Sequence, residues 1–318
     1  MDSLLDLTIS IQGWGPAWEG IMRFFSFLGT EEFFLLILPV LYWNLEATLG
    51  LRVGVILLTN GALNGLLKMF FHLPRPYWVS EKVIPLAGET SFGMPSGHAQ
   101  IGVGVWGMMA AGIRRSWAIV LAVVVVFFIG LSRIYLGVHF PQDVVAGWII
   151  GALLLWGFLS LERPFLSRFR RLSLGWQILS TWLFSIFLIV LAWGLRSQAS
   201  GLPFEWMRLA MRNGLEPPYP WSLSSVINPA AALFGLVTGA LWIEHKGGFA
   251  PFGMWWQRAL QYLIGVLGLL LLWMGLGALF PRGETWIAFS LRYARYALIG
   301  LWIGGIAPYV FQRFFRSS

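Results

Sequence analysis

The chain has 318 residues, of which 58% are hydrophobic and only 11% are charged. A soluble domain carries about 25% charged residues, so this composition excludes an ordinary soluble protein and indicates one that crosses a membrane. The absence of cysteine excludes disulfides, thiolate metal sites and cysteine nucleophiles. The net charge of +8 comes from Lys and Arg between apolar runs, which indicates membrane topology and not nucleic-acid binding.

The apolar runs predict an all-α, polytopic transmembrane helix bundle of about nine spans. Residues 1–29 are expected to form an interfacial segment, residues 30–195 a six-span core, residues 196–221 a polar connector and residues 222–318 a three-span extension. The expected spans are about 30–45, 49–71, 95–113, 116–136, 142–161, 175–195, 222–243, 258–280 and 286–311.

The distribution of basic residues predicts the orientation of the bundle. Lys and Arg concentrate in loops on the side opposite to the N-terminus, above all in RPFLSRFRR (163–171). The positive-inside rule places that side, and the C-terminus, in the cytoplasm. The N-terminal side then faces outwards, and a plasma (inner) membrane is the expected location.

Three polar clusters fall at the outward ends of the second to fifth expected spans. They are KMFFHLPRP (68–76), PSGH (95–98) and SRIYLGVHFPQD (132–143). Ionisable residues at membrane depth are costly and are functional candidates by default. Their position on one side predicts a single site.

The cations of these clusters favour phosphate as the ligand. Lys68, Arg75 and Arg133 bring three permanent positive charges, and arginine can grip a tetrahedral oxyanion in a bidentate manner. Pro95 suits the first turn of a helix, whose free amides form an anion site. Those amides belong to Ser96, Gly97 and His98.

Two histidines and an aspartate add chemistry to this anion site. Asp143 follows His139 by four residues and can accept the proton of one ring nitrogen, which leaves the other nitrogen as a nucleophile. His98 can protonate a leaving alkoxide. Taken singly, each residue has a simpler role at a membrane interface, but together they favour covalent phosphohistidine catalysis.

The motifs K-x6-RP, PSGH and SR-x5-H-x3-D, as they stand at 68–76, 95–98 and 132–143, resemble the three signatures of the type 2 phosphatidic acid phosphatase and vanadium haloperoxidase superfamily. The resemblance covers about residues 30–195 and implies a six-span phosphatase core that needs no metal or other cofactor. It implies that His139 is the nucleophile, His98 the acid and Asp143 the residue that orients His139. The residues implied to bind the phosphate are Lys68, Arg75, Ser96, Gly97 and Arg133.

Three further residues are candidates for support of the site. Asn64 lies one helical turn before Lys68 on the same face, and Ser132 belongs to the third signature. Tyr77 follows the RP pair and either walls the pocket or belongs to an interfacial aromatic belt, which is the simpler interpretation.

The main interpretation is an integral membrane phosphatase that hydrolyses a lipid phosphate monoester or diphosphate at the extracytoplasmic face. Its partners would be this substrate and membrane lipids, with no nucleic acid. Nine spans and RPYW (75–78) also resemble glucose-6-phosphatases, so a soluble phosphate ester is the alternative substrate. A non-enzymatic phospholipid binder or transporter is disfavoured because binding needs no oriented nucleophile. Arg292 and Arg295, in the last span, either extend the basic mouth or, more simply, reach the membrane surface.

Overall fold

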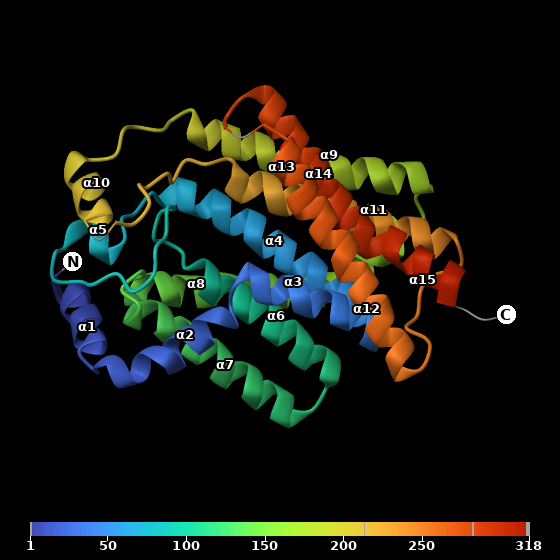
Figure 1. Cartoon of the computed structure of the whole chain (residues 1–318), viewed down its shortest axis with the longest axis horizontal. Helices are drawn as coiled ribbons and strands as arrows, with labels where there is room; N and C mark the ends of the chain where they lie inside the picture. The colour runs from blue at the N-terminus through green and yellow to red at the C-terminus, as the bar shows by residue number, and fades with distance from the viewer. Residues whose placement is uncertain (1, 213, 282, 316–318) are drawn as a thin grey trace. The chain divides into compact units, whose positions relative to one another are not determined.

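The computed structural model describes residues 2–212, 214–281 and 283–315, and this part of the chain contains helices and no strand (Figure 1). The predicted all-α fold is confirmed. Helices suit lipid because each backbone polar group is bonded within its own segment. The elements, with one 3-10 turn (η1) and three π turns (η2 to η4), are α1 Asp2–Gln12, η1 Pro16–Trp18, α2 Glu19–Phe27, α3 Glu31–Pro39, η2 Val40–Leu45, α4 Ala47–Phe71, α5 Pro76–Val79, α6 Gly97–Ile113, α7 Ser116–Tyr135, α8 Pro141–Phe169, α9 Leu174–Arg196, α10 Phe204–Met211, α11 Ser224–His245, α12 Trp255–Leu270, η3 Leu271–Gly275, α13 Leu276–Leu279, α14 Trp286–Leu301, η4 Trp302–Ile306 and α15 Ala307–Phe315.

The count of spans differs from the nine expected. Within the described ranges, seven helices are long and apolar enough to cross a membrane, and a pair bent by 50°, Pro16–Phe27 and Glu31–Leu45, makes an eighth if it is one span. The remaining expected span is α6, which has only 17 residues because its helix begins at Gly97. The seven are Ala47–Val79, Ser116–Tyr135, Pro141–Phe169, Leu174–Arg196, Ser224–His245, Trp255–Leu279 and Trp286–Phe315.

The chain divides into two compact units. Unit 1 comprises Met1–Phe33, Leu63–Gly157 and Leu191–Leu223, and unit 2 comprises Phe34–Ala62, Phe158–Val190 and Ser224–Ser318. Every candidate site residue lies in unit 1. The expected boundaries at residues 29, 195 and 221 stay predictions.

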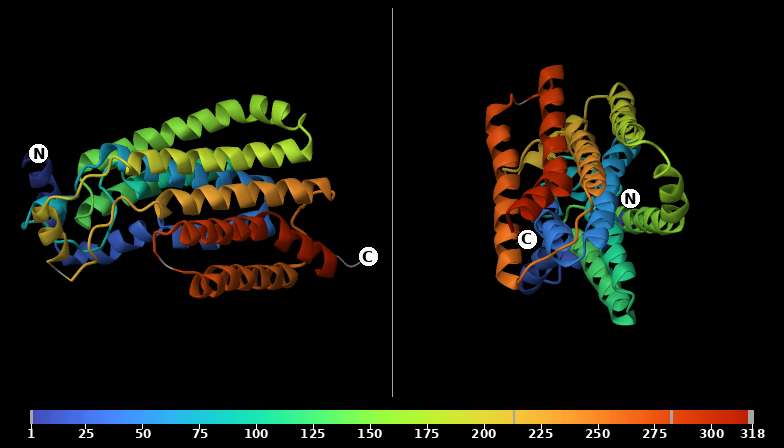
Figure 2. Two further views of the ribbon diagram at one scale, coloured as in Figure 1. Left: turned by 90° about the horizontal axis from the view of Figure 1, so that it is seen from above. Right: turned by 90° about the vertical axis from the view of Figure 1, so that its right-hand side faces the viewer.

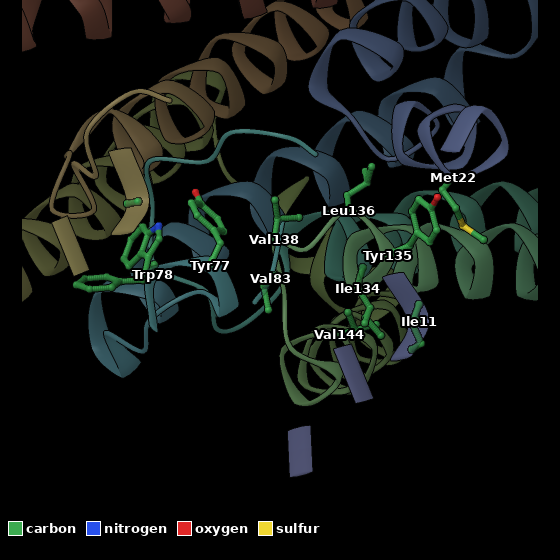
Figure 3. Packing of buried hydrophobic residues seen from close by; sticks show 13 residues of the cluster. Ile11, Met22, Tyr77, Trp78, Val83, Ile134, Tyr135, Leu136, Val138 and Val144 are labelled. Carbon is green, nitrogen blue, oxygen red and sulfur yellow. The ribbon is translucent and has the colours of Figure 1, made fainter. Parts of the chain in front are cut away.

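The core of unit 1 fixes the loops that carry the candidate site. Helices α6 and α7 lie side by side and are joined by a turn of two residues (Figure 1). Figure 3 shows Tyr77 and Trp78, both almost fully buried, next to each other in the same hydrophobic cluster as Val138. Short α5 is therefore anchored by its aromatic side chains, which fixes the backbone on either side of it.

Unit 2 is held together by closely packed small residues on α11, α14 and η4. Figure 2 shows α11 and α14 side by side. A Cβ at Gly235 would lie 1.9 Å from the carbonyl oxygen of Ala297, and one at Gly300 would lie 2.2 Å from that of Ala232. Only glycine permits this approach, which is the usual way in which helices associate in lipid.

Candidate active site

The three polar clusters predicted from the sequence meet in unit 1. Arg75, from the loop after α4, places Nη1 3.2 Å from Nε2 of His139, in the loop between α7 and α8. The backbone amide of Ser96, just before α6, donates a 2.9 Å hydrogen bond to the carbonyl oxygen of Asp143 in the first turn of α8. The chain thus joins the first cluster to the third, and the second to the third, by direct contacts.

His139 is almost fully buried and its two nitrogens have different partners. A guanidinium can only donate, so Nε2 accepts from Arg75 and the proton sits on Nδ1, 3.4 Å from Oδ2 of Asp143. That carboxylate oxygen also accepts a 2.9 Å bond from the amide of Phe140. Burial lowers the pKa of His139 well below its ordinary value, and the charges of Arg75 and Lys68 lower that pKa further.

Glu89, in the loop between α5 and α6, occupies the centre of the predicted anion site. Its carboxylate forms a short ion pair with Arg133 and lies 3.5 Å from Nη2 of Arg75. Burial alone would raise the pKa of Glu89, but Arg75, Arg133 and Lys68 together hold this pKa well below its ordinary range. A carboxylate thus sits among the three cations assigned to phosphate.

Ser91 bridges two of those cations. Its hydroxyl accepts from Nζ of Lys68 at 2.8 Å and from Nη2 of Arg75 at 3.0 Å, and its carbonyl oxygen accepts from Nε of Arg75 at 2.6 Å. The sequence interpretation missed both Glu89 and Ser91. The signal for Glu89 was charge, because GETSFGMPSGH (88–98) places one acid in the loop that must face three buried cations.

The start of α6 differs in one detail from the expectation. The helix begins at Gly97 with Ser96 as its N-cap, so Pro95 lies before the cap and not in the first turn. The amide of Ser96 is used by Asp143 and is therefore not available to an anion. The Ser96 hydroxyl is buried and has no hydrogen-bond partner in the described chain, while a Cβ at Gly97 would lie 3.0 Å from Oδ1 of Asn64.

His98 is half-buried and makes no hydrogen bond with the described residues, so its ring nitrogens remain available to a substrate. Its ring lies against Gly29, where a Cβ would come within 3.3 Å of Cδ2. Nearby on α2, the hydroxyl of Ser26 accepts a 2.6 Å bond from Nη1 of Arg133. The N-terminal segment therefore contributes to the site, which the motifs did not reveal.

The three support candidates have different contacts. Asn64 donates from Nδ2 to the carbonyl oxygen of Pro95 at 3.2 Å, which links α4 to the PSGH loop. The Tyr77 hydroxyl donates to the carbonyl oxygen of Glu89 at 2.8 Å, so this buried side chain holds the loop and is not part of an aromatic belt. The Ser132 hydroxyl donates at 2.6 Å to a carbonyl of its own helix.

Comparison with protein families now identifies the fold. Residues 49–167, which include every candidate site residue, match the PAP2 superfamily. This chain carries a PAP2 superfamily domain. Residues 227–318 match the transmembrane extension of PAP2 superfamily phosphatases. The predicted family resemblance is confirmed.

Similar proteins of known activity are membrane phosphatases. Glucose-6-phosphatase 3 of Homo sapiens is 33% identical over 166 residues, which cover 44% of this chain and 48% of that protein. Phosphatidylglycerophosphatase B of Bacillus subtilis is 28% identical over 152 residues, which cover 44% of this chain and 72% of that protein. Undecaprenyl-diphosphatase of Sulfolobus acidocaldarius is 27% identical over 146 residues, which cover 45% of this chain and 69% of that protein.

The chain spans about half the length of the glucose-6-phosphatases that it matches. Among solved structures, the transmembrane PAP2 type phosphatidylglycerolphosphate phosphatase from Bacillus subtilis covers 52% of this chain and 88% of its own. It is 24% identical, with a TM-score of 0.44.

Proposed function

We propose that the chain is an integral membrane phosphatase that hydrolyses a lipid phosphate monoester or diphosphate through a phosphohistidine intermediate. The observation that carries the proposal is the environment of His139. The lone pair of Nε2 faces the guanidinium of Arg75, and Asp143 lies at the protonated Nδ1. A phosphate held by Arg75 would therefore meet a neutral, oriented nucleophile.

The proposed reaction has two steps. Nε2 of His139 attacks phosphorus, so that an N–P bond forms while the ester P–O bond breaks, and His98 gives its proton to the leaving oxygen. His98 then takes a proton from water, whose oxygen attacks phosphorus and breaks the N–P bond to release phosphate. Lys68, Arg75, Arg133 and the amide of Gly97 stabilise the charge on the phosphoryl oxygens in both steps.

An apolar groove in unit 1 favours a lipid over a soluble ester. It has a volume of about 480 Å³ and is lined by Trp14, Trp18, Met22, Phe128 and Leu131. Both tryptophan side chains are more than 40% exposed, so the groove is open at the surface of the protein.

The groove runs along the two helices that deliver Arg133 and its partner. On α2, Met22 lies one turn before Ser26, on the same face of that helix. Ser26 in turn contacts Arg133. The acyl or prenyl chain of a lipid that lies in the groove would therefore place the phosphate of that lipid near the cations. Relatives named for phosphatidylglycerophosphate, sphingosine-1-phosphate and undecaprenyl diphosphate support this class.

Filling the groove separates the two substrate classes. Leu131→Trp should lower kcat/KM for phosphatidic acid strongly and leave kcat/KM for glucose 6-phosphate nearly unchanged. Val123→Trp, on the exposed face of the same helix, is the matched control. Equal losses for both substrates, or none for the lipid, would favour the soluble ester as substrate.

The activity itself is tested with the purified chain in detergent, without added metal. Phosphate release is measured from phosphatidic acid, phosphatidylglycerol phosphate, sphingosine phosphate, a C55 polyprenyl diphosphate and glucose 6-phosphate. We expect fast release from one lipid that EDTA does not inhibit. Tight phosphate binding without release from any substrate would instead support a binding protein.

We further propose that the site faces away from the cytoplasm, on the basis of the positive-inside rule. The chain has no cysteine, so single cysteines introduced at exposed positions can be labelled without background. In intact cells, a membrane-impermeant maleimide should label Lys82→Cys and should not label Arg170→Cys. The reverse pattern would place the site in the cytoplasm.

A further inference from the structure

Unit 2 contains a cavity that plays no part in the proposed reaction. Its volume is about 520 Å³, and it lies between the end of the helical run Trp255–Leu279 and the first turns of α14. Large apolar side chains, those of Trp273, Met274 and Phe280, form one wall. Arg292 and Arg295 form the other.

No described residue supplies a counter-charge to these two arginines. Neither makes an ion pair or a hydrogen bond with the described residues, and the Nε atoms of both are buried without a partner. The guanidinium of Arg295 lies 4.9 Å from the ring of Tyr296, and a Cβ at Gly277 would come within 2.5 Å of its Nη1. Gly277 thus makes room for the guanidinium, which packs against the ring of Tyr296.

The depth of the arginines makes this lack of a partner costly. Helix α14 begins at Trp286, so with a rise of about 1.5 Å per residue Arg292 lies about 9 Å, and Arg295 about 13.5 Å, along the helix axis from that first residue. Unpaired charges within a membrane span are rare and call for an anion. The neighbouring side chains of Trp286 and Ile287 are about 70% exposed, as expected for a surface that faces lipid.

We propose that this cavity binds the head-group phosphate of one anionic phospholipid between Arg292 and Arg295. The phosphodiester supplies the missing negative charge, and the apolar wall of Trp273 and Met274 accommodates the first part of an acyl chain. Basic pockets between transmembrane helices are known to recognise such head groups. The site lies on the transmembrane extension, and the proposal does not depend on the phosphatase activity.

Native mass spectrometry of the full chain, delipidated in detergent and titrated with defined lipids, tests the proposal. We expect one tightly held phosphatidylglycerol and only weak, unsaturated addition of phosphatidylcholine. Arg292→Gln/Arg295→Gln should weaken phosphatidylglycerol binding at least about tenfold, since a charge-assisted contact is lost at each residue. Arg313→Gln, an exposed arginine on α15, should leave it unchanged.

Inorganic phosphate at millimolar concentration should not displace the lipid, because it cannot use the apolar wall. Displacement by phosphate would assign the cavity to a free anion and overturn the proposal. Equal binding of the two lipids, or unchanged binding in the double variant, would also overturn it. Ala278→Phe, which fills the cavity and keeps both charges, should weaken binding as well, and it decides the matter if the double variant does not fold.

Discussion

Replacement of Glu89 by glutamine is the perturbation that tests the anion site most sharply. The carboxylate of Glu89 lies against Arg133 and Arg75, which are two of the three cations assigned to phosphate. Glutamine keeps the shape of the side chain and removes its charge. If phosphate must displace this carboxylate, the variant should bind inorganic phosphate and vanadate more tightly than the wild type.

The expected size of the effect follows from the contacts. A hydrogen bond between charged groups contributes about 1.5–3 kcal/mol, and displacement of Glu89 breaks its close pair with Arg133. Each 1.4 kcal/mol is a factor of ten in affinity, so inhibition by phosphate should become about ten- to a hundredfold stronger. Product release should slow accordingly, so kcat should fall together with KM.

The assay is inhibition of lipid phosphate hydrolysis by inorganic phosphate and by vanadate, for the wild type, Glu89→Gln and Glu205→Gln. Glu205 is an exposed partner of Arg208, and its replacement controls for loss of a surface ion pair. We expect stronger inhibition of Glu89→Gln alone. Unchanged or weaker inhibition would refute the reasoning, and would mean that Glu89 organises the arginines and does not compete with phosphate.

Three further predictions concern the catalytic groups. His139→Ala should abolish turnover without loss of the folded protein, as judged by circular dichroism, while His245→Ala, outside the site, should retain activity; substantial turnover by the first variant would rule out this nucleophile. Because the pKa of His139 is lowered, its neutral form persists in mild acid, so the acid limb of the pH–rate profile for kcat/KM should have its midpoint below pH 6.5; an acid midpoint above this value would contradict the assignment. Ser96→Ala should lower kcat/KM about ten- to a hundredfold, because the Ser96 hydroxyl has no partner among the described residues and can bind a charged phosphate. Ser132→Ala should change kcat/KM less than about threefold, because the Ser132 hydroxyl is bonded to the carbonyl oxygen of Ile129. Similar losses in the two variants would contradict these contacts.

The sequence predicted the all-α fold, and it predicted that the three polar motifs form one site. Both predictions depend on local signals, which are the long apolar runs and the motifs at their ends. It predicted a span that starts at about residue 142, with Asp143 near its beginning, and α8 begins at Pro141. It did not predict that the helix after PSGH starts at Gly97, since that start depends on the bond from Ser96 to Asp143, which comes from a distant helix.

Glu89 shows a second limit of the sequence interpretation. An acid in a loop of mixed composition is ordinarily exposed, and no spacing rule connects it to the motifs. Its role emerges only when α4, α7 and the loop after α5 are placed together, which brings Lys68, Arg75 and Arg133 around one carboxylate. The contribution of Ser26 likewise depends on α2 packing against α7.

Trapping of the phosphorylated enzyme tests the central claim most directly. The wild type and His98→Ala are mixed briefly with 32P-labelled lipid phosphate, quenched in alkali, which preserves phosphohistidine, and digested for peptide mapping. We predict an acid-labile label on the peptide that contains His139. The label should be stronger in His98→Ala if the loss of His98 slows the attack of water on the phosphohistidine more than it slows phosphoryl transfer to His139. Label on another residue, or turnover by the wild type without any labelled intermediate, would contradict the account.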